Sequence, residues 1–158
     1  MKKYSFICLS LLVALTFSAC QSISNVPTDA TEFQGHYYKV FESKVTWHQA
    51  EEQCRQMGGM LASVKSAEAN DFIVKLSQAK GMWIGGSDEV KEGEWLWRDG
   101  SKLTYSKWAS SEPDNWYDGK EHWTVIGWPG KRYADGKWGD TQAFSQEPID
   151  GFVCEWTD

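Results

Sequence analysis

The feature that most constrains this chain is the spacing of its cysteines. Cys8 and Cys20 lie within the first 20 residues, which leaves only Cys54 and Cys154 in the rest of the sequence. In an exported and oxidising compartment, two such cysteines are expected to form a disulfide. The bridge would close a loop of roughly 100 residues, which stabilises a fold by on the order of 4–5 kcal/mol in the chain-entropy model. We therefore expect a domain whose end is fastened to its beginning.

The first 20 residues indicate export. Lys2 and Lys3 precede the apolar run FICLSLLVALTF, and the small residues Ser18 and Ala19 stand directly before Cys20. A charged start, an apolar stretch too short to span a membrane as a mature helix and a small-residue cleavage site are typical of a secretory signal. The cysteine after the small residues makes the segment resemble a bacterial lipobox. That resemblance implies cleavage before Cys20, lipidation of its sulfur and a membrane anchor.

Two residues beside Cys20 bear on this interpretation. Phe17 stands where the lipobox usually has an aliphatic residue, so a plain secretory signal is the alternative. Gln21 is not the Asp that retains lipoproteins at the inner membrane of some Gram-negative bacteria. We therefore expect a lipid-anchored protein of the cell envelope, at the outer membrane.

These features divide the chain into a lipoprotein signal peptide at 1–19, a lipidated tether at 20–34 and a single domain at 35–158. The tether is polar and short of large apolar residues, whereas the domain is long enough to bury one core. Removing Lys2 and Lys3 from the 16 basic residues leaves 14 against 22 acidic ones, so the mature protein is more acidic than the net charge of −6 of the whole chain. This acidity argues against a nucleic-acid partner, because phosphate binding needs basic side chains.

Apolar periodicity within the domain predicts two helices followed by short strands. After a strand at HYYKVF, Thr46 opens a capping box with Gln49, and the glycines at 58–59 end the first helix. Ser66 caps a second helix, which we expect to end at Gly81. Beyond it, apolar pieces separated by turn residues predict strands at MWIG, EWLW, LTY, HWTVIGW and GFVCEW. This order indicates an α+β domain with an antiparallel sheet.

The segment from about 99 to 122 has no predicted helix or strand. Loops of this length are uncommon and tend to be functional. It holds the stretch SSEPDNWYDGKEH, in which four acidic residues surround Trp116. Most of the ten Trp residues lie inside apolar pieces and are expected in the core. Trp116 is the exception, and we expect it to be exposed for ligand contact.

Five segments together resemble the C-type lectin-like domain. They are CRQMGGMLASVKSAEANDFI, WIGGSDEVKEGEWLWRDGSKLTYSKW, EPDNW, KWGD and GFVCEW, and they run in order from about residue 35 to 158. The resemblance implies a double-loop α+β fold with paired ends, two helices, short antiparallel strands and a long ligand-binding loop. Calcium-dependent sugar binding is the best-known activity of this family, while other members bind proteins or ice.

The resemblance also implies a calcium site in the long loop. In sugar-binding members, a Glu-Pro-Asn or Gln-Pro-Asp triplet, a later Glu and a Trp-Asn-Asp segment hold one ion, and two vicinal sugar hydroxyls complete its shell. The implied metal ligands in this chain are Glu112, Asp114, Glu121 and Asp140. The first two flank a proline that is expected to follow a cis bond. The implied ligand-binding residues are Glu112, Asp114, Trp116 and Glu121.

The chain departs from the family pattern in ways that affect the ligand. Gly139 stands where the pattern has an Asn, so one side-chain oxygen is missing. Asp114 replaces the Asn of the mannose-type triplet, which leaves few amide donors for a sugar hydroxyl unless Asn115 or Gln142 supplies one. Trp116 lies two residues after Asp114, as in galactose-type members, where the indole packs on the apolar face of the sugar. The sequence therefore favours calcium more strongly than sugar, and galactose-type sugars over others.

Some members carry an auxiliary calcium site, and its matching residues here are Asp88, Glu92 and Asn115. His122 stands where the pattern has an acid, and imidazole is a poor ligand for the hard Ca²⁺ ion. The alternative is that Asp88 and Glu92 lie in a solvated turn.

The favoured function is an envelope-anchored lipoprotein that binds a glycan or glycoconjugate through calcium. The alternative is a protein-binding or adhesion domain on the same fold, with or without calcium. An enzyme is the least favoured class. A glycosidase pair at Glu112 and Asp114 is its best form, but two carboxylates flanking a proline suit a cation site better. The three histidines form no recognisable catalytic constellation: they are His36, His48 and His122.

Overall fold

The computed structural model describes residues 25–116, 118–128, 131–144 and 149–157. The proposed signal peptide and the lipidation site Cys20 lie outside these residues, so export and lipidation stay predictions. Within the described ranges, no helix is both long enough and apolar enough to cross a membrane.

Helix α1 (Trp47–Gln56) begins where the sequence predicts it. The Thr46 hydroxyl accepts the N–H of Gln49, and the Gln49 side chain accepts the N–H of Thr46, so the capping box is complete. The helix ends at Gln56, ahead of the glycines at 58–59. Its buried face consists of Trp47, Ala50 and Cys54.

Helix α2 (Ala67–Leu76) begins at the predicted cap but ends earlier than expected. The hydroxyl of Ser66 accepts a backbone N–H of the first turn at 3.1 Å. The expected end at Gly81 is wrong, because Gln78 and Ala79 adopt left-handed φ angles of 54° and 57°. Residues in that conformation terminate a helix even when they are not glycine.

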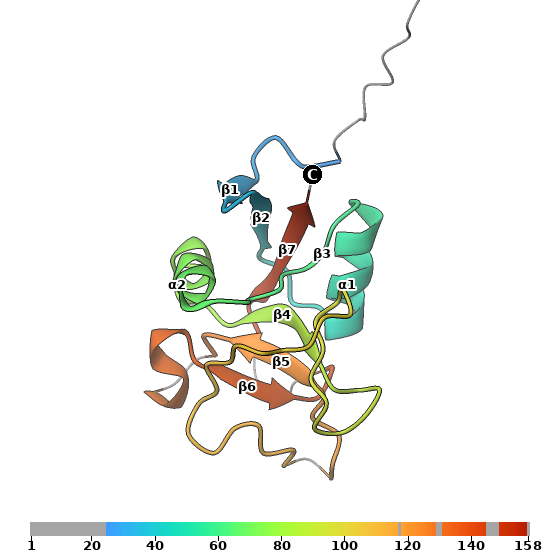
Figure 1. Cartoon of the computed structure of the whole chain (residues 1–158), viewed down its shortest axis with the longest axis vertical. Helices are drawn as coiled ribbons and strands as arrows, with labels where there is room; N and C mark the ends of the chain where they lie inside the picture. The colour runs from blue at the N-terminus through green and yellow to red at the C-terminus, as the bar shows by residue number, and fades with distance from the viewer. Residues whose placement is uncertain (1–24, 117, 129–130, 145–148, 158) are drawn as a thin grey trace, which may run out of the picture.

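The described residues form a seven-stranded sheet in the order β1-β2-β7-β4-β5-β6, with β3 paired to β7 (Figure 1). Neighbouring strands are antiparallel except β4 and β7, which run parallel, so the sheet is mixed rather than wholly antiparallel. The strands are β1 (Thr31–Phe33), β2 (His36–Phe41), β3 (Met60–Leu61), β4 (Met82–Ser87), β5 (Trp123–Ile126), β6 (Trp138–Thr141) and β7 (Gly151–Thr157).

Several strands differ from the sequence prediction. EWLW and LTY are not strands, and this region has two isolated β-bridges, of Leu96 with Ser87 and of Leu96 with Lys102. Turns on either side of EWLW leave too little extended chain for a ladder. β6 is not predicted, because its sequence WGDT has only one large apolar residue. β1 lies within 20–34, so the sheet starts before the predicted beginning of the domain.

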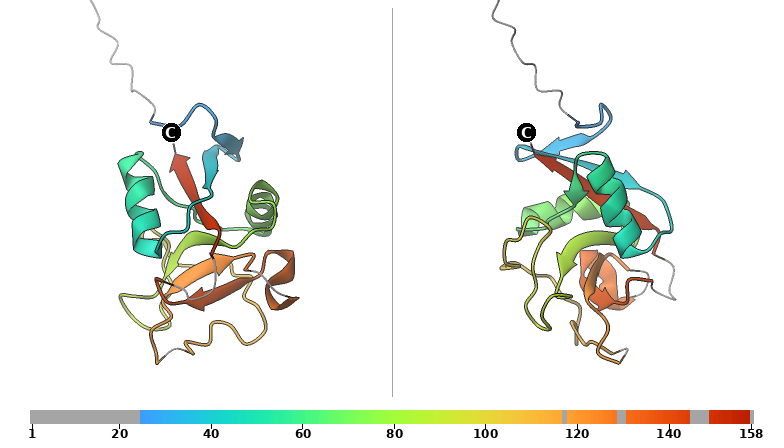
Figure 2. Two further views of the ribbon diagram at one scale, coloured as in Figure 1. Left: turned by 180° about the vertical axis from the view of Figure 1, so that it is seen from behind. Right: turned by 90° about the vertical axis from the view of Figure 1, so that its right-hand side faces the viewer.

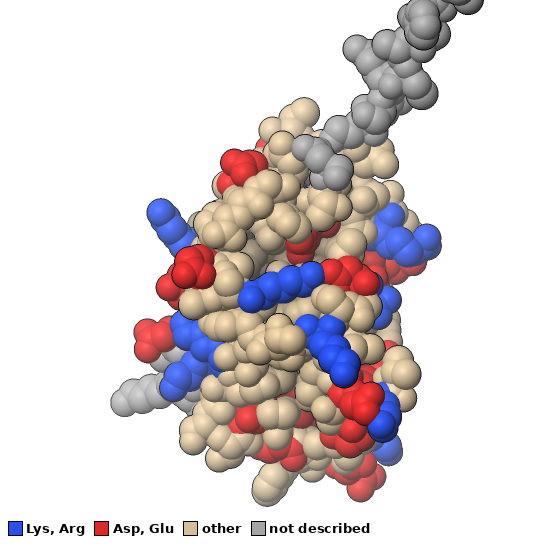
Figure 3. Space-filling model, in the orientation of Figure 1, with Lys and Arg blue, Asp and Glu red and all other residues tan. Residues whose placement is uncertain are grey.

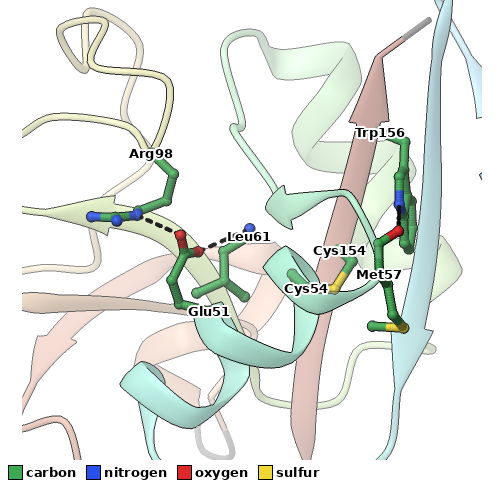
Figure 4. The surroundings of a disulfide bond; sticks show 7 residues. All are labelled: Glu51, Cys54, Met57, Leu61, Arg98, Cys154 and Trp156. Carbon is green, nitrogen blue, oxygen red and sulfur yellow. Dashed lines mark hydrogen bonds and ion pairs between the residues drawn. A yellow bond between two sulfur atoms is a disulfide. The ribbon is translucent and has the colours of Figure 1, made fainter. Parts of the chain in front are cut away.

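The two ends of the domain are fastened together as predicted. Strand β2 pairs with β7 from His36 opposite Thr157 to Phe41 opposite Phe152. The disulfide joins Cys54 of α1 to Cys154 of β7, with Cα atoms 5.5 Å apart, and Figure 4 shows it beneath α1. The predicted bridge is therefore confirmed.

The helices lie on opposite sides of β7, as Figures 1 and 2 show, and each covers an apolar core. The core beneath α1 contains Trp47 and Trp83, and the core beneath α2 contains Ile73 and Trp138. Trp138 is fully buried, and its indole N–H donates to Asn70 of α2 at 2.7 Å. This packing fixes β6, the strand that carries part of the functional site.

Candidate metal centre and ligand pocket

The long loop lies at the end of the molecule away from β1 and from the end of β7 (Figure 1). Of its described residues, 99–116 and 118–122, only Lys102 and Trp108 take part in β-bridges. Trp108 bridges Trp138, and the N–H of Ala109 donates to the Trp138 carbonyl at 2.8 Å, which ties the loop to β6. For these described residues, the prediction of a long loop without helices or strands is confirmed.

The acidic triplet is fixed to β6 by Asp140. The peptide bond between Glu112 and Pro113 is cis, as predicted. Oδ1 of Asp140 accepts the backbone N–H of Asp114, and Oδ2 accepts that of Asn115, both at 3.0 Å. Asp140 is only 3% exposed, so these charge-assisted hydrogen bonds are largely shielded from water.

Three of the four predicted metal ligands come together. Glu112, Asp114 and Asp140 each place a carboxylate oxygen within 4.8 Å of the others. Glu121 lines the same pocket but is not part of this group, and its Oε2 accepts the N–H of Trp116 at 2.6 Å. Ca²⁺ takes about 6–8 hard oxygen ligands, so the donor set fits a calcium ion that also binds water or hydroxyls.

Burial, together with the crowding of these carboxylates, changes the ionisation of Glu112. Burial, a hydrogen bond with Asp140 and the nearby negative charges raise the pKa of Glu112 to about 8, against a hydrogen bond from Tyr133 that lowers it. A raised pKa favours the protonated acid in the folded protein. The associated stabilisation is fully present below the unfolded value of 4.5 and is lost as the pH rises through about 8. A divalent cation would relieve the repulsion among the ionised groups.

The carboxylates line an open pocket of about 700 Å³. Trp116 stands at its edge and is 78% exposed, as predicted for a ligand-facing residue. Trp128 and Tyr133 also line the pocket, with ring centroids 5.3 Å apart. Figure 3 shows acidic side chains over this end of the molecule, below a band of Lys and Arg that crosses the middle. The pocket therefore combines negative charge with aromatic surface.

Some pocket residues were not predicted from the sequence. The hydroxyl of Tyr133, in the 3₁₀ helix η1 (Lys131–Gly136), donates to Oε1 of Glu112 at 2.9 Å. No sequence pattern indicates this contact, because it joins residues from separate segments of the chain. The other unpredicted lining residues are Ser110, Ser111 and Trp128.

Neither predicted amide donor lines the pocket. Asn115 donates from Nδ2 to Glu92 at 2.6 Å and accepts the N–H of Glu121 with Oδ1 at 3.0 Å. Its amide is therefore directed towards the auxiliary group rather than the triplet. Gln142 is likewise absent from the residues that line the pocket.

The predicted auxiliary site contains a second group, in which Asp88, Glu92 and His122 place ligand atoms within 4.8 Å of one another. His122 Nδ1 lies 3.0 Å from Asp88 Oδ1 and 3.7 Å from Glu92 Oε2. Asp88 is 1% exposed, so the alternative of a solvated turn is wrong for Asp88, although Glu92 is exposed. The predicted Asn115 reaches this group through its hydrogen bond to Glu92. The imidazole lies between the carboxylates, an arrangement that suits an ion pair better than Ca²⁺.

Comparison with known families identifies the class of protein. A family model described as the C-type lectin domain matches residues 43–156. The chain therefore belongs to the C-type lectin domain family, a carbohydrate-binding family of non-enzymatic proteins whose members typically bind Ca²⁺.

The chain is similar to versican core protein from Rattus norvegicus and from Homo sapiens. Each is 36% identical over 109 residues, which cover 69% of this chain but 4% and 3% of the two versican proteins. The chain thus spans only a small part of the length of these curated relatives.

Solved structures of similar proteins confirm the fold. The C-type lectin CEL-I from Cucumaria echinata has a TM-score of 0.71 and 32% identity, covering 82% of this chain and 95% of that one. The cow carbohydrate-recognition domain of CD23, solved in the presence of GlcNAc2Man3 oligosaccharide, has a TM-score of 0.72 and 33% identity, covering 84% and 95%. Herring type II antifreeze protein has a TM-score of 0.71 and 27% identity, covering 84% and 98%.

Proposed function

We propose that this chain is a calcium-dependent lectin that a lipid on Cys20 anchors to the cell envelope. Glu112, Asp114 and Asp140 would hold the ion, with Glu121 beside them. When bound, calcium supplies positive charge to the carboxylates and coordination positions for two vicinal sugar hydroxyls.

One observation carries the metal part of this proposal. Carboxylate oxygens from the triplet and from β6 lie within 4.8 Å of one another in one pocket. They come from distant parts of the sequence, since Asp114 and Asp140 are 26 positions apart. A retaining glycosidase separates its two carboxyl groups by about 5–5.5 Å and an inverting one by more. Three carboxylates at shorter spacing are better suited to share a cation than to act as an acid and a nucleophile.

The sugar part depends on Trp116. Its indole is exposed at the edge of the pocket, two residues after Asp114. A flat amphipathic ring in this position suits contact with the apolar face of a sugar. The galactose-type sequence pattern and this exposure together support a galactose-type glycan as the ligand.

Calorimetry with Ca²⁺ tests the metal, and a glycan array with and without EGTA tests the sugar. Calcium should raise the melting temperature and EGTA should lower it, because the ion binds the folded state. Glu112→Gln and Asp114→Asn form a matched pair, since each removes one charge and adds one amide. We expect the first to favour galactose-type glycans and the second mannose-type glycans. No calcium binding at millimolar concentration would overturn the metal claim.

A protein-binding or adhesion domain is the second candidate. The observation that favours it is the composition of the pocket, because none of its described lining residues has a side-chain amide. A sugar hydroxyl bound to calcium would then lack the usual amide N–H donor. Calcium binding with no glycan on the array would support this candidate and remove the sugar claim alone.

The anchor requires its own test, because Cys20 lies outside the described residues. Expressed in a Gram-negative bacterium, the full chain should partition into detergent with the outer-membrane fraction. Cys20→Ala should release it to the soluble fraction. Unsubstituted protein found wholly soluble would show that the lipobox interpretation is wrong.

A further inference from the structure

The space beside Gly139 is filled by Tyr133. A Cβ atom built on Gly139 would lie 2.7 Å from Cε1 of Tyr133 and 3.3 Å from its Cζ and hydroxyl oxygen. Real Cβ atoms essentially never approach a neighbour closer than 3.0 Å, so a side chain at 139 and this ring exclude each other. Gly139 has no left-handed φ. Glycine is therefore required here by space and not by backbone conformation.

The ring that fills this space also holds a candidate metal ligand. The hydroxyl of Tyr133 donates to Oε1 of Glu112 at 2.9 Å, in a part-buried position. A hydrogen bond to one oxygen restricts the rotation of the whole carboxylate, and such outer contacts orient metal ligands in proteins. Tyr133 thereby orients Glu112 within the group that contains Asp114 and Asp140.

We propose that Tyr133 is a positioning residue of the calcium site, which holds Glu112 through its hydroxyl and occupies the space that a ligating side chain at position 139 would need. This inference rests on the proposed function and deepens it. Compared with the family pattern, which has an Asn at this position, the site lacks one direct oxygen ligand at Gly139, but the orientation of Glu112 is fixed. The ring of Tyr133 packs beside Trp128, so this part of the pocket is aromatic, which favours a sugar with an apolar face there.

Tyr133→Phe removes the hydroxyl but keeps the ring, so it tests the role of the hydroxyl alone. We expect it to weaken calcium binding about tenfold by calorimetry, which corresponds to about 1.4 kcal/mol. The melting temperature in EGTA should stay within roughly 2 °C of the unsubstituted protein, because the ring and its packing remain. Tyr105→Phe is the matched control. Tyr105 is also partly buried against Trp138 but does not line the pocket, so calcium affinity should not change.

A double-mutant cycle tests the exclusion between the two positions. Gly139→Asn alone should weaken calcium binding and lower the melting temperature in EGTA, since its side chain meets the ring of Tyr133. Tyr133→Ala alone should weaken calcium binding. The double variant Tyr133→Ala/Gly139→Asn should recover both properties, because the space is cleared and an amide oxygen is added. If the double variant loses less than the sum of the two single variants, positions 133 and 139 are energetically coupled.

The outcomes separate this inference from the proposed function. If the unsubstituted protein binds no calcium, the proposed function fails, and the positioning role fails with it. If calcium binds normally and Tyr133→Phe leaves the affinity unchanged, or the double variant shows additive losses, the positioning role alone is wrong.

Discussion

Asp140 is expected to hold the long loop even when no cation is bound. Its two oxygens accept the N–H groups of Asp114 and Asn115 at 3.0 Å, and the residue is 3% exposed. A hydrogen bond to a charged group contributes about 1.5–3 kcal/mol, so the pair contributes about 3–6 kcal/mol. Asp114 is exposed, so its N–H can reach water after a substitution. We therefore expect Asp140→Ala to lower the free energy of unfolding by about 3 kcal/mol, at the lower end of this range.

Urea unfolding in EGTA measures this effect, because the chelator removes the contribution of calcium. Asp140→Asn keeps the shape and one acceptor oxygen but presents an NH₂ group to the second backbone N–H, so it should cost about as much. Both variants should abolish the rise in melting temperature caused by calcium. Lys120→Ala is the control in the same loop. Its side chain is 67% exposed, and its effect should stay within about 0.5 kcal/mol.

Equal stability of Asp140→Ala and the unsubstituted protein in EGTA would refute this reasoning. If calcium binding were lost at the same time, Asp140 would be a metal ligand only. If calcium binding were kept but stability fell, Asp140 would anchor the loop without binding the ion.

Three further outcomes are expected. Replacing Cys54 and Cys154 by Ala should lower the free energy of unfolding by about 4–5 kcal/mol, since the bridge spans 100 positions; equal urea midpoints would contradict this. Trp116→Ala should change stability in EGTA by less than about 0.5 kcal/mol, because the residue is 78% exposed, yet weaken glycan binding at saturating calcium more than Trp116→Phe does. In EGTA, stability should fall as the pH rises from 4.5 to about 8, because over this range Glu112 loses its proton in the unfolded chain but keeps it in the folded protein. Glu112→Gln should flatten this profile, and an unchanged profile would show that other groups cause the fall.

The parts of the fold that depend on local signals could be predicted from the sequence. Thr46 and Ser66 cap their helices as expected, because capping uses residues within one turn. The bridge between Cys54 and Cys154 follows from the cysteine count, because they are the two cysteines that remain beyond the predicted signal peptide and the predicted lipidation site Cys20. The loop and the exposure of Trp116 follow from an absence of periodicity and a polar surrounding.

Features that depend on distant contacts could not be predicted. The parallel pairing of β4 with β7 joins strands about 70 residues apart, and no short pattern encodes it. The hydrogen bond of Tyr133 to Glu112 arises only when η1 packs beside the loop. Likewise, the position of His122 between two carboxylates depends on β5 lying next to β4. Sequence patterns identified most of the acidic residues of the site, but not the groups that orient them.

The position of β7 in the sheet determines when the domain can fold. This strand comes last in the chain, yet it lies between β2 and β4 and also pairs with β3. Until residues 151–157 are available, β2 and β4 have no common neighbour, and the two apolar cores lack the residues of β7 that belong to them. A chain that crosses a membrane from its N-terminus would thus arrive unfolded and complete its sheet only when its last residues emerge. Contacts of such long sequence separation also make folding slow.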